Sequence, residues 1–82
     1  MQPEFEAILA SDLSEADKLA RTFQLIITQH MEHSRRDIEL FKALGDKEAL
    51  VKEQIKLGVL EYSLGVWAHC YYRVTGRKVA DD

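Results

Sequence analysis

Residues 37–57, DIELFKALGDKEALVKEQIKL, decide the fold because they hold the break between two long helical patterns. Gly45 readily takes the left-handed conformation that ends a helix. Asp46, directly after it, is a residue type that caps the start of a following helix. We therefore expect one helix to end at residue 44 and another to begin at residue 47. Because the connection is so short, the two helices must lie antiparallel, as a hairpin.

Both helices extend far from this turn. Two overlapping capping boxes, at residues 12–15 and 14–17, mark the start of the first helix, which we place at residues 14–44. The second helix runs without proline to Gly76, another residue suited to end a helix, and we place it at residues 47–75. Helices of this length extend about 45 Å at 1.5 Å per residue.

The remaining residues complete one all-α domain over residues 1–82. Pro3 suits the first turn of a short helix at residues 3–11, and we expect residues 77–82 to form a frayed tail. One proline and four glycines argue against a turn-rich β fold. A hydrophobic content of 46% is that of a globular protein rather than a disordered one.

Charge and cysteine content argue against several classes of partner. A net charge of −3 lacks the basic footprint of nucleic-acid binding. Cys70 is the single cysteine, which favours a reducing compartment, and the first residues lack the layout of a signal peptide. Residues 57–72 are strongly apolar, but they are few for a membrane span and include Glu61 and His69. We expect a cytoplasmic protein that binds neither nucleic acid nor membranes.

The second helix carries more apolar surface than one partner helix can cover. From Leu57 onward its apolar residues point in nearly every direction, so it must be buried on all sides. A second copy of the hairpin would complete this burial and produce a four-helix bundle, as a homodimer or a higher even oligomer. We assign the oligomer interface to Leu60, Trp67 and Tyr71. The first helix has a single apolar face, formed by Leu19, Phe23, Ile26, Ile27, Phe41 and Leu44.

Polar residues lie at the centres of the apolar faces, where core residues are expected. On a wheel at ~100° per residue they are His30 and Asp37 on the first helix and Gln54 and Glu61 on the second. The turn places residues whose numbers sum to about 90 or 91 at the same height, so His30 faces Glu61 and Asp37 faces Gln54. Two further polar residues lie at the edges of the first helix's face, His33 and Ser34.

Two interpretations of these residues differ in chemistry. In the first, His30–Glu61 and Asp37–Gln54 are buried hydrogen-bonded layers that set the register of the bundle. In the second, His30, His33 and Glu61 bind iron or zinc, because two imidazoles and a carboxylate are suitable ligands for either metal. A two-fold axis would then double the set, as in a ferritin-like bundle.

A third interpretation is a ligand pocket. Gly58 and Gly65 lie about one turn on either side of Glu61, and a glycine inside a helix costs about 1 kcal/mol relative to alanine. Close helix packing would explain this cost, and so would room for a small molecule beside Glu61.

The sequence favours a binding protein over an enzyme. It contains no nucleophile–base arrangement, no glycine-rich phosphate loop and no paired-cysteine metal motif. We expect a homo-oligomeric helical bundle that acts by protein–protein interaction, as an adaptor or regulatory module, with its polar layers setting register. The alternative is a metal-binding bundle that uses His30, His33 and Glu61 with iron or zinc.

Overall fold

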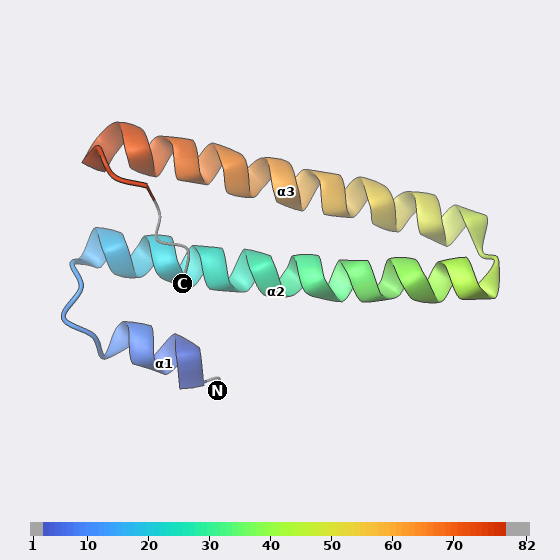
Figure 1. Cartoon of the computed structure of the whole chain (residues 1–82), viewed down its shortest axis with the longest axis horizontal. Helices are drawn as coiled ribbons and strands as arrows, with labels where there is room; N and C mark the ends of the chain where they lie inside the picture. Colours follow the sequence, from blue (N-terminus) through green and yellow to red (C-terminus); the bar gives the residue numbers. More distant parts are fainter. Residues whose placement is uncertain (1–2, 79–82) are drawn as a thin grey trace.

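The computed structural model describes residues 3–78 and consists there of three helices, α1 (Pro3–Leu9), α2 (Glu15–Leu44) and α3 (Lys47–Thr75). The long helices α2 and α3 lie antiparallel side by side, and α1 lies along the N-terminal part of α2, on the side away from α3 (Figure 1). The predicted all-α class and the helical hairpin are confirmed. The molecule measures 47 × 29 × 15 Å between Cα atoms, so it is one layer of helices thick.

The turn between the long helices has the predicted chemistry. Gly45 adopts φ 70°, the left-handed conformation, and its N–H donates to the Lys42 carbonyl at 3.2 Å. The Asp46 N–H donates to the Phe41 carbonyl at 3.0 Å, which completes a Schellman motif. The Asp46 carboxylate accepts the Ala49 N–H at 3.1 Å and caps α3. These three hydrogen bonds fix the hairpin connection.

The other helix ends differ slightly from expectation. Ser14 is the N-cap of α2 and accepts the Asp17 N–H at 3.2 Å, so the second of the two capping boxes is the one used. Gly76, at φ 71°, ends α3 as predicted. Helix α1 ends at Leu9 instead of residue 11. The predicted frayed tail lies mostly outside the described residues.

The contact between α2 and α3 is built from residues that alternate three and four apart, the spacing of a coiled coil. We call this line of residues the hairpin seam. On α2 its buried members are Ala20, Met31, Ser34 and Ile38. On α3 the line consists of half-buried residues: Leu50, Glu53, Leu57, Leu60, Leu64, Trp67 and Tyr71. One layer of helices therefore leaves α3 without a fully buried side chain among the described residues.

The structure corrects the predicted orientation of both helices. Leu19 and Leu44, expected to face inward, are 58% and 68% exposed, whereas Ser34, expected at the edge of the apolar face, is 0% exposed. The inward direction of α2 is thus rotated by about 80° from the one predicted. On α3, Leu60 and Trp67 belong to the hairpin seam and not to an outer surface. The Trp67 ring stacks on Phe23 with 4.7 Å between ring centroids.

The relative heights of the two helices are close to the prediction. Asp17 contacts Tyr71, Phe23 contacts Trp67 and Ser34 contacts Glu53. These pairs have residue numbers that sum to 88, 90 and 87, close to the expected 90 or 91. The turn therefore sets the height of each residue, while packing sets which side of each helix faces inward.

Candidate functional site

The four residues predicted to form buried polar layers do not lie in the hairpin seam. His30, Gln54 and Glu61 are exposed, and Asp37 is half-buried. The prediction of buried layers inside the hairpin is wrong, because the rotation of α2 places Met31, Ser34 and Ile38 at the contact instead.

The predicted metal ligands are not assembled within one chain. Over residues 3–78, no group of three or more His, Cys, Asp or Glu side chains is arranged to hold a metal ion. His33, with 67% of its side chain exposed, instead lies 3.3 Å from the Asp37 carboxylate, one turn further along α2. The set of His30, His33 and Glu61 therefore gives no iron or zinc site in this hairpin.

The predicted ligand pocket beside Glu61 is also not formed. A Cβ atom added at Gly58 or Gly65 would meet no atom within 4 Å, so both glycines border open space and not an internal cavity. Both are exposed positions on α3. The glycines leave the backbone of α3 accessible from outside.

The buried polar contact of the hairpin joins Ser34 to Glu53. The Ser34 hydroxyl donates to Glu53 Oε2 at 2.6 Å, and only 13% of the Glu53 side chain is exposed. This hydrogen bond is the main cause that lowers the pKa of Glu53, and Lys56, at 3.5 Å, adds to it. Sequence reasoning missed the pair, although Glu53 lies three residues after Leu50 and four before Leu57 on the coiled-coil spacing. A charged residue at a position of that spacing is the sequence feature that would have predicted the pair.

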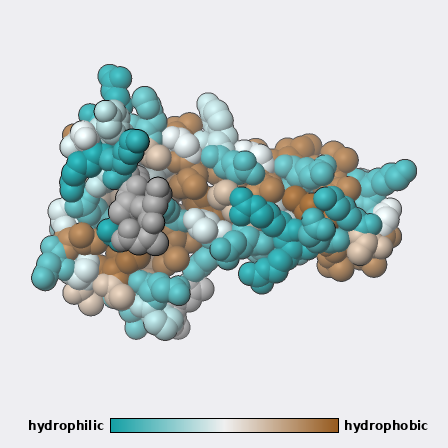
Figure 2. All heavy atoms as spheres, viewed as in Figure 1, coloured by the Kyte–Doolittle hydropathy of each residue, from teal (hydrophilic) through white to brown (hydrophobic). Residues whose placement is uncertain are grey.

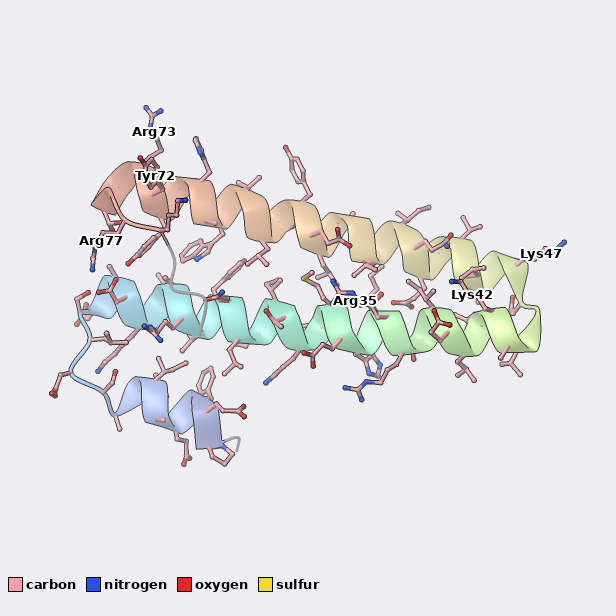
Figure 3. All side chains as sticks on the ribbon, in the orientation of Figure 1. Arg35, Lys42, Lys47, Tyr72, Arg73 and Arg77 are labelled. Atoms are coloured by element: carbon pink, nitrogen blue, oxygen red, sulfur yellow. The ribbon has the colours of Figure 1, made fainter. Side chains whose placement is uncertain are left out.

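A second polar cluster closes the open end of the hairpin. The Tyr71 hydroxyl donates to the Asp17 carboxylate, and the Arg77 guanidinium donates to both Asp17 oxygens at 3.3 and 3.4 Å. Arg77 also lies 5.9 Å from the centre of the Tyr71 ring, within cation–π range. In Figure 3, Arg77 reaches from the end of α3 toward the start of α2. A pocket of about 140 Å³ lies here, lined also by Leu13, Ala20, Arg21 and Lys78.

The cluster perturbs two titrations in opposite directions. The hydroxyl of Tyr71 holds the pKa of Asp17 below its ordinary value, with further lowering by Ser14 and Arg77. The same hydrogen bond raises the pKa of Tyr71. A carboxylate with a lowered pKa stabilises the fold above its ordinary value, 3.8 for Asp17, and loses that contribution as the pH falls through the lowered value. Ionised Asp17 therefore links the start of α2 to the end of α3 at neutral pH.

We expect Asp17→Asn to lower the melting temperature at pH 7 and to lower it less at about pH 2. The reason is that the stability contributed by ionised Asp17 is lost as the pH falls below 3.8 and through the lowered pKa of Asp17, so the two proteins become more alike in strong acid. Circular dichroism melts at both pH values measure this difference. Asp12→Asn, at an exposed carboxylate just before α2, is the matched control and should follow the wild type. An equal destabilisation by Asp17→Asn at both pH values would contradict the role of the charge.

An exposed apolar surface lies along one face of α3. It is formed by Val51, Ile55, Val59, Tyr62 and Val66, which are 53, 63, 59, 75 and 46% exposed. We call this set the outer face of α3. Spacings of three and four residues keep it within about 80° of the helix circumference, on the side opposite the hairpin seam. In Figure 2, hydrophobic atoms gather along the upper right edge, where Figure 1 places the N-terminal half of α3.

The residues predicted to form the oligomer interface lie on the side of α3 that faces α2. Leu60, Trp67 and Tyr71 are half-buried against α2, and the residues that remain exposed are those of the outer face. Cys70, beside that face, is exposed as well. The apolar character around α3 was read correctly from the sequence, but the pattern alone did not show which side meets α2.

Comparison with protein-family models, with curated proteins and with solved structures finds no match to this chain. None of the helices within residues 3–78 combines the length and the apolar character that crossing a membrane requires.

Proposed function

We propose that the chain is a small homo-oligomeric helical module that acts by protein–protein interaction, in which two hairpins pair into a four-helix bundle. The observation that carries the proposal is the exposure of the outer face of α3, where Tyr62 is 75% and Ile55 is 63% exposed. The buried hydrophobic residues of the described chain are only Ala20, Met31 and Ile38. More large apolar side chains thus face solvent than fill the core.

This distribution is unfavourable for an isolated hairpin. Removing apolar surface from water contributes roughly 25 cal/mol per Å², and contiguous exposed apolar patches on small proteins commonly mark interaction sites. The one-layer shape gives a second reason, because a second layer of helices would cover α3 on the side that α2 does not reach. Pairing of two hairpins would bury the exposed apolar surface and would supply the second layer of helices.

The bundle would present charged faces to a partner protein. Arg35 and Lys42 lie on the face seen in Figure 3, and Figure 2 shows hydrophilic side chains across much of the same view. We propose that these surfaces bind the partner while the apolar surfaces hold the two copies together. A cytoplasmic location is part of the proposal, since Cys70 is exposed and unpaired, which suits a reducing compartment.

Sedimentation equilibrium of the full chain at micromolar concentration tests the proposal. We expect twice the chain mass of 9.4 kDa, or a higher even multiple. A mass that stays at that of one chain up to the highest concentration reached would contradict it.

A further inference from the structure

The outer face of α3 carries charges of opposite sign at its two ends. Glu48 lies one turn before Val51, and Arg73 lies about two turns after Val66. At ~100° per residue both fall within the sector of the outer face. The Glu48 side chain is 82% exposed, and Arg73 projects from α3 away from α2 (Figure 3). The face is thus apolar in the middle, acidic at one end and basic at the other.

We infer that two copies of this chain pack their outer faces together with the α3 helices antiparallel, so that Glu48 of each copy meets Arg73 of the other. This inference rests on the proposed function and adds the surface and its geometry. The two-fold axis passes between Val59 and Tyr62, near the middle of the outer face. The outer face of one chain is thus covered by the outer face of a second copy.

Residue heights support this register. In an antiparallel pair centred between Val59 and Tyr62, facing residues have numbers that sum to about 121. Ile55 then faces the partner's Val66, and Val59 faces the partner's Tyr62. The same sum brings Glu48 opposite the partner's Arg73, so one arrangement matches the apolar residues and both charged ends.

The parallel alternative has the opposite electrostatics. It would place Glu48 beside the partner's Glu48 and Arg73 beside the partner's Arg73, which sets like charges together at both ends. Glu48 also forms an ion pair with Lys52 at 3.1 Å, but both side chains are more than 70% exposed, so this pair costs little to rearrange. Charge complementarity therefore selects the antiparallel pair.

The two mid-helix glycines fit the same interface. Gly58 and Gly65 flank the outer face, and the space where their Cβ atoms would stand is open. A glycine in a helix costs about 1 kcal/mol relative to alanine, and a close approach of another helix backbone is a physical reason to retain it. At Gly58 and Gly65 that approach can come only from outside the hairpin.

Charge reversal tests the pairing. Each of Glu48→Arg and Arg73→Glu alone should raise the dimer dissociation constant about tenfold, because each creates two like-charge contacts across the two-fold axis. The double variant should return it to within about twofold of the wild type, because the ion pairs are restored with their signs exchanged. Glu32→Arg, an exposed reversal on α2, is the control and should change it by less than about twofold.

The outcomes separate the geometry from the proposed function. A dimer that persists while the double variant stays as weak as the single ones, or while the single variants have no effect, overturns the antiparallel register and leaves self-association standing. A wild type that remains monomeric overturns the proposed function itself. Circular dichroism of each variant shows whether the helices are intact.

A cross-link provides a second measurement that does not depend on the charged residues being tolerated. In the antiparallel pair, position 52 faces the partner's Cys70, whereas within one helix the two positions are about 27 Å apart at 1.5 Å per residue. Under air oxidation, Lys52→Cys should give a dimer whose disulfide joins position 52 to position 70. Peptide mapping that finds only links between identical positions would establish the parallel arrangement and overturn the inference.

Discussion

Replacing Trp67 with alanine should lower the free energy of unfolding by about 3 kcal/mol, the lower end of the cost of removing a packed aromatic side chain. Trp67 stacks on Phe23 with 4.7 Å between centroids and belongs to the hairpin seam near the open end. A domain of this size has a total stability of roughly 4–12 kcal/mol, so this one substitution removes a large part of it. Urea denaturation at fixed protein concentration measures the loss.

Trp67→Phe is the matched control for this experiment. The Trp67 indole N–H is buried without a hydrogen-bond acceptor in the described structure, so phenylalanine keeps a stacked ring and removes an unsatisfied donor. We expect the free energy of unfolding to fall by less than about 1.5 kcal/mol, as for other exchanges between hydrophobic core residues of similar size. If Trp67→Ala were no more destabilising than Trp67→Phe, the stacking with Phe23 would not be a principal contact between the helices.

Ile55→Lys should dissociate the oligomer, with a dissociation constant at least about a hundredfold higher. Ile55 is 63% exposed in the hairpin and belongs to the outer face, so the substitution changes two symmetric positions of the proposed interface at once. Each position needs to lose only about 1.4 kcal/mol to reach that factor. The helix content of the monomer should remain, because lysine is well tolerated on an exposed helical surface. Sedimentation equilibrium and circular dichroism measure the two quantities.

Gln54→Lys controls for the added charge, since position 54 is exposed on the same helix but outside the outer face. It should keep the mass of the wild type. A second comparison uses α2, which exposes its own large apolar residues at Leu19, Ile26, Leu40 and Leu44. If Leu40→Lys dissociated the oligomer and Ile55→Lys did not, the interface would lie on α2.

Local chemistry explains why the hairpin was predictable. The left-handed Gly45, the Asp46 cap and the Ser14 cap depend on neighbouring residues only, and each was read directly from the sequence. The same turn set the heights at which Asp17 and Phe23 meet α3. These features need no knowledge of how side chains pack.

Rotation of the helices could not be predicted in the same way. Helix α3 is apolar nearly all round, so the line through Leu57 and Trp67 and the line through Ile55 and Tyr62 are both credible inward faces. The choice is made by tertiary contacts such as Phe23 on Trp67 and Ser34 on Glu53. A wheel of α2 alone, drawn through its largest apolar residues, placed His30 inward. The small Ser34 permits a closer contact and takes that place.

The central claim is that the outer face of α3 is covered by a second copy of the chain. Isotope-filtered NOE spectroscopy on a mixture of labelled and unlabelled chains tests it most directly, because only contacts between copies give a signal. We expect signals from the Tyr62 ring to the methyl groups of Val59 of the other copy, and from the methyl groups of Ile55 to those of Val66 of the other copy. Intermolecular signals confined to α2 residues such as Leu19 and Leu40, or none at millimolar concentration, would contradict the claim.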